Sequence, residues 1–375
     1  MRVKLKDIFD LQMGKTPSRS NLEYWNTTDY KWISIADLTK TSKYIFETKE
    51  YLSKSAIKDS GIKVIPANTV VMSFKLSIGK TAITKEDMYS NEAIMAFKDK
   101  HVINIIPEYI FYLFKYKNWE ECSNKAVMGK TLNKATLSEI EVEICSIEKQ
   151  RQIVNILDKI MSAVDGRKQE LQLLDELIKA RFVEMFGDPV KNPKGWEVVT
   201  IGDIVTEVRY GTSKPAVEGG KYPYLRMNNL TADGHLDLND LKYIDIPDDE
   251  IEKCVVRKGD VLFNRTNSIE LVGKTVVFDL QEDMIIAGYI IRVRLNKRLL
   301  PEILSQYMNL EALKDILRSM AKGAVNQANI NAQELRSIKV YIPDMELQKQ
   351  FIEMKNQVDK SKVAVQKALD ETQIL

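Results

Sequence analysis

Arginine, asparagine, lysine and serine are concentrated in short loops at several places in this sequence, and their side chains can bind a charged ligand. Lysine and serine are suited to phosphate oxygens, which they contact without distinguishing one base from another. Arginine is suited to guanine, and asparagine and glutamine to adenine, by paired hydrogen bonds in the major groove of DNA. These residue types therefore predict that the loops bind nucleic acid.

The candidate residues form matching patches in the two halves of the chain. A surface loop of this composition is often only a solvated turn, so the prediction rests on the recurrence of the patches. In the first half the candidates are Lys15, Thr16, Ser18, Arg19, Lys75, Lys80, Lys130 and Asn133. In the second half they are Arg209, Tyr210, Thr212, Ser213, Lys214, Arg226, Asn228, Asn264, Arg265, Thr266, Asn267, Lys274, Asn326 and Gln327.

The phosphate-binding loop of nucleotide-hydrolysing enzymes is excluded, although Gly-Lys-Thr triplets recur along the chain. Such a loop needs another glycine five residues before the glycine of the triplet. The triplets begin at Gly14, Gly79, Gly129 and Gly273, and the required positions hold Phe9, Phe74, Asn124 and Ser268.

No catalytic or metal-binding residue is predicted. An adenine methyltransferase would need a glycine-rich cofactor loop and a proline dipeptide ending in an aromatic residue, such as NPPY, and the sequence has neither. A metal-dependent nuclease needs spaced carboxylates, whereas the acidic runs 248–253 and 344–349 are crowded. We interpret the first run as a solvated turn and the second as a helix start, where acidic residues favour the helix dipole.

Composition places few limits on the partners of this chain. The 375 residues include 55 basic and 53 acidic side chains, so the net charge of +2 predicts only local basic surfaces. No apolar run reaches the ~18 residues of a membrane span, and the first residues lack a signal-peptide core, so we expect a cytoplasmic protein. Cys122, Cys145 and Cys254 are odd in number and far apart, which favours reduced thiols over disulfides or a zinc site.

An internal repeat supplies the elements that would position the candidate loops. Leu5-Lys-Asp-Ile8 matches Ile201-Gly-Asp-Ile204, and a loop rich in glycine, threonine, serine and proline follows each. YKWISIADLT from Tyr30 then parallels YPYLRMNNLT from Tyr222. Further β-rich runs, a Gly-Lys-Thr triplet and a helix opened by proline continue in the same order in both halves. The repeat predicts the order unit, helix, unit, helix.

Two long amphipathic helices are predicted, one after each unit. The first has a seam of apolar residues at alternating four- and three-residue steps, interrupted only by Arg167, and it stops at Gly187-Asp188-Pro189. We predict that the two helices pair antiparallel within the chain; the alternative is that each packs on a separate core. The first seam comprises Ile153, Leu157, Ile160, Val164, Leu171, Leu174 and Ile178, and the second comprises Phe351, Met354, Val358, Val365 and Leu369.

The predicted fold class is α+β, with two similar globular units separated by an antiparallel pair of long coiled-coil helices in a pseudo-twofold arrangement. The predicted boundaries are 1–147 for the first unit, 148–186 for the central spacer helix, 187–345 for the second unit and 346–375 for the distal spacer helix.

This organisation resembles the specificity subunit of type I restriction-modification systems, and the resemblance covers the whole chain. Its most specific signals are the connector, Phe186-Gly-Asp-Pro189 followed by Asn192-Pro-Lys-Gly-Trp196, and the way each unit closes. A glycine, an asparagine, an apolar strand and a helix start rich in glutamate and glutamine follow one another at each closure. The first closure departs from the pattern, with Cys145 and Ser146 where prolines are usual.

The resemblance implies a non-catalytic DNA-binding subunit, whose two units are target recognition domains for the two halves of a split, asymmetric sequence. The helices would set the gap and dock two methyltransferase subunits, and restriction subunits with motor and nuclease activity would join for cleavage. S-adenosylmethionine, ATP and Mg are then expected on the partner subunits, and no cofactor is expected in this chain.

The length of the central helix agrees with a spacer. About 35 helical residues at ~1.5 Å each span roughly 50 Å, which is on the order of 15 base pairs at ~3.4 Å each. Two alternatives stay open, namely the specificity subunit of a fused methyltransferase-nuclease system and a stand-alone DNA-binding adaptor. A self-sufficient enzyme is disfavoured by the missing cofactor and metal motifs.

Overall fold

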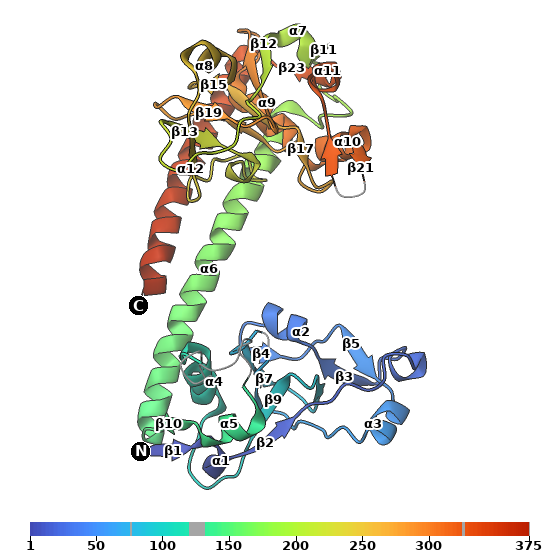
Figure 1. Ribbon diagram of the computed structural model, residues 1–375, viewed down its shortest axis with the longest axis vertical. Helices are drawn as coiled ribbons and strands as arrows, with labels where there is room; N and C mark the ends of the chain where they lie inside the picture. The colour runs from blue at the N-terminus through green and yellow to red at the C-terminus, as the bar shows by residue number, and fades with distance from the viewer. Residues whose placement is uncertain (76, 120–131, 325–326, 375) are drawn as a thin grey trace. The chain divides into compact units, whose positions relative to one another are not determined.

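The computed structural model describes residues 1–75, 77–119, 132–324 and 327–374, and the chain divides into two compact units. Unit 1 is Met1–Ala163 and unit 2 is Val164–Leu375, so the boundary falls inside the helix α6 (Ile147–Phe186). Figure 1 shows α6 continuing from one unit into the other. The prediction of a long helix over 148–186 is confirmed.

Unit 1 is built on a five-stranded sheet in the order β2-β9-β6-β7-β4, beside a three-stranded sheet β5-β3-β8 and a pair β1-β10. Its strands are β1 (Arg2–Lys4), β2 (Phe9–Met13), β3 (Tyr30–Ile33), β4 (Tyr44–Ile45), β5 (Glu50–Leu52), β6 (Val70–Ser73), β7 (Thr81–Thr84), β8 (Tyr89–Ser90), β9 (Ile94–Asp99) and β10 (Glu141–Glu143). Its helices before α6 are α1 (Leu5–Ile8), η1 (Leu22–Tyr24), α2 (Ile35–Lys40), α3 (Lys54–Ser60), α4 (Pro107–Tyr116) and α5 (Lys134–Glu139).

Unit 2 has sheets in the orders β12-β20-β16-β18, β14-β13-β19-β15, β11-β23 and β17-β22-β21. Its strands are β11 (Glu197–Thr200), β12 (Val205–Tyr210), β13 (Tyr222–Leu225), β14 (Lys242–Ile244), β15 (Val255–Val256), β16 (Val261–Asn264), β17 (Thr266–Asn267), β18 (Thr275–Val277), β19 (Met284–Ile286), β20 (Ile290–Leu295), β21 (Lys322–Ala324), β22 (Gln327–Asn329) and β23 (Lys339–Ile342). Its helices after α6 are α7 (Ile201–Ile204), η2 (Met227–Asn229), α8 (Asp248–Cys254), α9 (Pro301–Met308), α10 (Glu311–Met320), α11 (Ala332–Ser337) and α12 (Met345–Ile374).

The strand orders confirm the predicted internal repeat. The order β2-β9-β6-β7 in unit 1 corresponds to β12-β20-β16-β18 in unit 2, and β5-β3-β8 corresponds to β14-β13-β19. A parallel pair lies at the same place in both units, β3 with β8 and β13 with β19, although most of the neighbouring pairs are antiparallel. The two halves of the sequence therefore fold into the same arrangement, α+β as predicted.

The second half of α6 pairs antiparallel with α12, as the apolar seams predict. The rings of Phe182 and Phe351 lie 5.2 Å apart, and Asp175 forms an ion pair with Lys362 at 2.5 Å. Further back on α6, Arg167 donates to the carbonyl oxygen of Ala368 and to the hydroxyl of Thr372. Residues earlier in α6 therefore contact residues later in α12, which shows that the two helices are antiparallel. Arg167, the polar break in the seam, binds the partner helix directly.

The first turns of α6 pack instead on the core of unit 1, through Ile153, Val154, Leu157 and Met161. A buried glutamine fixes the start of each long helix. Gln150 in α6 accepts a hydrogen bond from the backbone nitrogen of Ile106 at 3.0 Å, and Gln348 in α12 accepts one from Leu300 at 2.9 Å. Because both donors immediately precede a proline-led helix, the amide joins that helix to the long helix in each unit.

Candidate DNA interface

Unit 2 contains a cavity of about 600 Å³ at which several of the predicted DNA-binding residues meet. Its walls come from the loop after β12, from the segment that begins η2, from the residue after β16 and from the loop after β19. The predicted residues that line it are Thr212, Ser213, Lys214, Arg226, Asn228 and Arg265. Candidates from three distant stretches of sequence are thus brought together by the fold.

The loop after β12 is held close to β19 by a glycine. A Cβ atom on Gly211 would lie 2.1 Å from the carbonyl oxygen of Ile286, so no larger residue fits there without movement of the backbone. Thr212 then donates its backbone N–H to the same oxygen at 2.9 Å. The hydroxyl of Tyr224 donates to the carbonyl oxygen of Lys214 at 3.0 Å. These contacts fix the loop at the edge of the cavity.

Arg265 lies against an aromatic ring and has no carboxylate partner among the residues that the structure describes. Its guanidinium carbon is 4.9 Å from the centre of the Tyr210 ring, and one of its terminal nitrogens is 3.4 Å from the carbonyl oxygen of Gly288. Its Nε is buried without a hydrogen-bond partner in the described part of the chain. A buried donor without a partner is uncommon in folded proteins. Because the side chain lines the cavity and has no carboxylate partner in the described ranges, its terminal nitrogens can donate to a ligand there.

Arg226 is the second arginine of the cavity, and a surface carboxylate holds it. It donates to Asp240 at 2.8 Å, and its Nε is also buried without a partner among the described residues. Lys242 and Arg226 lower the pKa of the Asp240 carboxyl, which is mostly exposed. Exposed ion pairs contribute little to stability, so this arginine can exchange its partner for a ligand at small cost.

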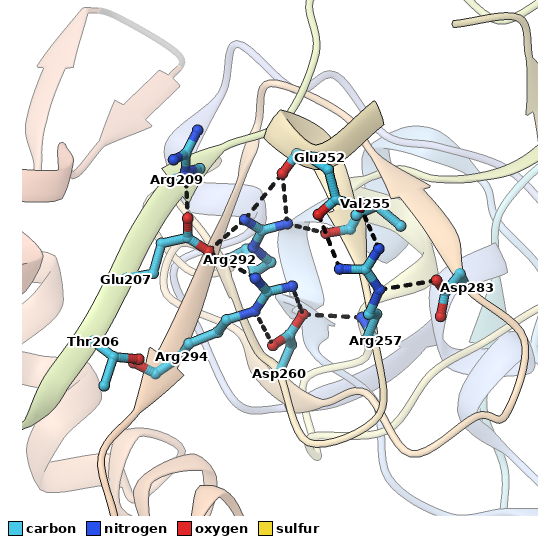
Figure 2. Close-up of polar contacts among 10 residues, drawn as sticks. All are labelled: Thr206, Glu207, Arg209, Glu252, Val255, Arg257, Asp260, Asp283, Arg292 and Arg294. Atoms are coloured by element: carbon cyan, nitrogen blue, oxygen red, sulfur yellow. Dashed lines mark hydrogen bonds and ion pairs between the residues drawn. The ribbon is translucent and has the colours of Figure 1, made fainter. Parts of the chain in front are cut away.

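A network of ion pairs joins β12 and β20 of unit 2 to Asp260, which precedes β16, as Figure 2 shows. Arg292 is 1% exposed and donates to Glu207 at 2.6 Å, and Arg294 donates to Glu207 at 2.9 Å and to Asp260 at 2.8 Å. Burial alone would raise the pKa of the Glu207 carboxyl, but Arg292, Arg209 and Arg294 outweigh it, so that the pKa is lowered. The network joins β12 to β20. It therefore fixes the strand that ends with Arg209 and Tyr210.

Four other predicted residues of unit 2 serve the fold around this cavity and do not line it. Asn264 is fully buried, and its amide donates to the carbonyl oxygens of Thr266 and Tyr289, each at 3.2 Å. Asn267 donates to Asn264, and Thr266 donates to Asn329. Lys274 donates to the carbonyl oxygen of Met227 at 2.8 Å, and burial lowers its pKa. We leave these four residues out of the candidate interface.

In unit 1 the predicted first loop is exposed, but several of its side chains have partners within the unit. Arg19 pairs with Glu50, and its guanidinium carbon is 3.8 Å from the centre of the Trp25 ring. Thr16 donates to Glu92, and Lys15 donates to the carbonyl oxygen of Ser60. The hydroxyls of Ser18 and Ser20 are 2.8 Å apart. In the counterpart loop of unit 2, Lys214 likewise has a partner within its own unit, because it pairs with Glu250 at 2.8 Å.

The other predicted residues of unit 1 that the structure describes lie in separate local environments. Asn133 caps α5 by accepting a hydrogen bond from the backbone of Thr136 at 2.8 Å. The ammonium of Lys75 lies 5.4 Å from the ring of Phe74, and Lys80 is half-buried after the turn that follows β6. In unit 2, Gln327 is exposed on β22. Lys130, Asn326 and Cys122 lie outside the described residues.

A second cavity, of about 780 Å³ in unit 1, was not predicted as a whole. It contains Lys15 from the predicted set, and its other basic residues come from the β-strands, from short helices and from the segment after α3. These lysines come from separate stretches of the sequence, so no local signal groups them into one surface. The basic residues that line this cavity are Lys6, Lys15, Lys63, Lys98, Lys100 and Lys134.

The type I restriction modification DNA specificity domain matches this chain over residues 1–176 and again over residues 193–372, so both repeats are covered. The chain belongs to this family. The MjaIX specificity subunit of Methanocaldococcus jannaschii is 30% identical over 60% of this chain and 57% of that protein. The EcoKI specificity subunit of Escherichia coli K12 is 25% identical over 63% of this chain and 54% of that protein. The matches thus span little more than half the length of these relatives.

Two solved structures share the fold. A chain from a structure on complex assembly and conformational transition of the type I R-M system has a TM-score of 0.61 at 18% identity, over 99% of this chain and 93% of that chain. The S subunit from M. genitalium has a TM-score of 0.53 at 13% identity, over 100% of this chain and 93% of that chain. None of the helices in the described ranges combines the length and apolar character needed to cross a bilayer.

Proposed function

We propose that this chain is the DNA-specificity subunit of a type I restriction-modification complex. Unit 1 and unit 2 are target recognition domains, and each binds one half of a bipartite, asymmetric DNA sequence. The observation that carries this proposal is the duplication of unit and long helix over nearly the whole chain, with a DNA specificity domain matching each copy. Two similar binding units on one chain suit a target with two separate parts.

The cavity of unit 2 supports direct recognition of bases. Arg226 and Arg265 both line it, and Asn228 and Lys214 lie at the same cavity. Arginine recognises guanine and asparagine recognises adenine by bidentate hydrogen bonds, each worth about 1–3 kcal/mol of discrimination. Among the described residues Arg265 has no carboxylate partner, and Arg226 pairs with the mostly exposed Asp240, so the terminal nitrogens of both arginines can bind a base edge.

The long helices are the proposed spacer and docking surface. A helix of 40 residues such as α6 is about 60 Å long at ~1.5 Å per residue. Leu173 and Leu177 lie one turn apart on α6 and are 54% and 43% exposed. Exposed apolar side chains on one helical face favour a protein partner, and we assign this face to a methyltransferase subunit.

Catalysis in this proposal belongs to the partner subunits. Two methyltransferase subunits would bind S-adenosylmethionine, and restriction subunits would bind ATP and Mg. This chain would contribute the choice of DNA sequence in the cytoplasm and no reacting group. The residue inventory supports that division, because the sequence contains neither a phosphate-binding loop nor a methyltransferase motif.

Methylation mapping tests the proposal. The chain is expressed with a cognate methyltransferase subunit in a host whose DNA is otherwise unmethylated, and methylated adenines are mapped across the genome. We expect a split asymmetric motif with a fixed gap, which disappears when this chain is omitted. Methylation that does not depend on this chain, or none despite a stable complex, would contradict the proposed function.

A further inference from the structure

The lysine-lined cavity of unit 1 is an open groove along β2, and it has an excess of positive charge. Lysines line it at six positions, whereas the carboxylates that line it are Asp10 and Glu92. Figure 1 shows β2 running from beside α5 toward α3, and the groove includes residues of α5 and of the segment that follows α3. We call this surface the lysine groove.

Three of these lysines lack an ion-pair partner within the described ranges. Lys6 pairs with Glu139 at 2.5 Å, and Lys100 lies 3.8 Å from Asp10. Lys15 donates to a backbone carbonyl oxygen. For Lys63, Lys98 and Lys134, the described part of the chain shows no carboxylate within ion-pair distance, which leaves their ammonium groups to solvent or to a ligand.

The corresponding surface of unit 2 is electrically compensated. Lys98 of unit 1 and Arg294 of unit 2 are matched positions, because Lys98 lies opposite Asp10 in the pairing of β2 with β9 and Arg294 lies opposite Glu207 in the pairing of β12 with β20. Arg294 forms ion pairs with both Glu207 and Asp260, whereas Lys98 forms none with the described residues. The first residue of α5 is Lys134, whereas the first residue of α11 in unit 2 is Ala332. The excess charge is therefore a property of unit 1 and not of the shared fold.

The chemistry of the groove favours a chain of phosphates over a base. Lysine is a compact point charge that contacts phosphate without bidentate geometry. The described residues that line the groove include no arginine, and the aromatic residue among them, Phe9, is 3% exposed, so they offer neither paired hydrogen bonds nor a stacking surface to a base. A groove of about 780 Å³ with several separated ammonium groups suits consecutive phosphodiesters.

We propose that the lysine groove binds the sugar-phosphate backbone of duplex DNA, so that it adds sequence-independent, salt-sensitive affinity to the binding of a half-site by unit 1. This inference rests on the proposed function and assigns the phosphate contacts of the DNA-bound chain. The groove accounts for affinity and position on the duplex, and it does not select a sequence.

The test compares variants of the full chain by fluorescence anisotropy with labelled duplexes of several unrelated sequences, from about 50 to about 200 mM salt. The variant Lys63→Gln/Lys98→Gln/Lys134→Gln removes the unpaired charges. The variant Lys40→Gln/Lys49→Gln/Lys54→Gln removes equal charge from exposed positions outside the groove. A third variant, with Lys63, Lys98 and Lys134 each changed to Arg, keeps the charge, and circular dichroism checks that all variants are folded.

For the groove variant we expect the plot of log K against log salt to become shallower by about 0.9 for each phosphate that the protein no longer neutralises. Binding should weaken equally for every duplex, while the control and arginine variants keep the slope of the unmodified chain. An unchanged slope in the groove variant would overturn the inference, and so would weaker binding to one sequence only. If the unmodified chain shows no salt-dependent binding to any duplex even when its methyltransferase subunits are present, the proposed function itself fails.

Discussion

The two units have different residues at matching positions of their corresponding sheets. β6 of unit 1 ends at Ser73 and is followed by Phe74, which is 1% exposed in the core. β16 of unit 2 ends at Asn264 and is followed by Arg265, which lines the candidate interface. Each residue donates its backbone N–H to the corresponding turn of its own unit, Phe74 to the carbonyl oxygen of Ala93 at 3.0 Å and Arg265 to that of Tyr289 at 2.9 Å.

This difference shows what the fold requires and what it leaves open. The backbone hydrogen bond is common to both units, so the strand and its turn form whichever side chain follows. The side chain then decides whether the position adds to the core or faces a ligand. The matching places in β9 and β20 also differ, since Ala96 lies in the core of unit 1 whereas Arg292 forms a buried ion pair with Glu207 in unit 2. A repeated scaffold can therefore carry two binding surfaces of different chemistry.

The largest expected contrast concerns how the two units pack on the long helices. Phe351 on α12 is fully buried, and its ring lies 5.2 Å from Phe182 and 5.6 Å from Phe186. We expect Phe351→Ala to lower the free energy of unfolding by about 3–5 kcal/mol, because it opens a cavity in an aromatic cluster.

The matched position in unit 1 is Ile153, which is only partly buried. Ile153→Ala should lower the free energy of unfolding by less than about 2 kcal/mol, since water already reaches the side chain. Denaturant unfolding of the two variants measures the contrast. Equal losses of stability would show that the helices are anchored alike in both units.

A second contrast concerns how the stability of unit 2 depends on pH through Lys314. Lys314 of α10 donates to the carbonyl oxygen of Gly273 at 2.6 Å, and burial lowers its pKa to about 8. Between about pH 8 and pH 10.5 the folded state has released a proton that the unfolded state still holds, so stability rises with pH by up to about 3 kcal/mol.

We expect Lys314→Met to remove this rise from the thermal unfolding of unit 2. The described elements of unit 1 contain no counterpart of α10, so its transition should not show the same dependence. A Lys314→Met variant that kept the full rise between pH 8 and 10.5 would assign it to another group.

A third contrast tests base recognition at the position of Arg265. We expect Arg265→Ala to relax or weaken one half of the methylation motif and to leave the other half unchanged, with a loss of about 1–3 kcal/mol in discrimination. Arg298→Ala is the matched control, because Arg298 is exposed in unit 2, pairs with Glu197 and does not line the cavity. A motif identical to that of the unmodified chain would remove Arg265 from the interface.

The repeat and the long helices could be predicted because each leaves a pattern in the sequence itself, self-similarity for the repeat and apolar spacing for the helices. Apolar spacing identified α6 and α12, and Arg167, the polar residue in the seam, contacts α12 in the structure. Self-similarity identified the two units without any knowledge of how their strands pair. The strand orders could not be derived in this way, because they depend on contacts between distant segments.

The sequence could not show which of the candidate residues would line the cavity of unit 2, and two neighbouring residues explain why. Arg265 and Asn264 are neighbours, yet Arg265 lines the cavity while Asn264 is fully buried with its amide bonded to the backbone. Composition cannot distinguish these two environments. The lysine groove was missed for the opposite reason, since Lys63, Lys98 and Lys134 come from separate elements and meet only in the folded unit.

The most direct test of the account is to change the length of α6 and map the methylation motif again. Four residues are inserted near Arg167, about one helical turn, and methylated adenines are mapped as for the unmodified chain. Two units that bind separate half-sites across a helical spacer should keep both half-sites and change only the gap between them. A variant that kept the gap, or that altered the half-sites themselves, would contradict the claim that the helix sets their spacing.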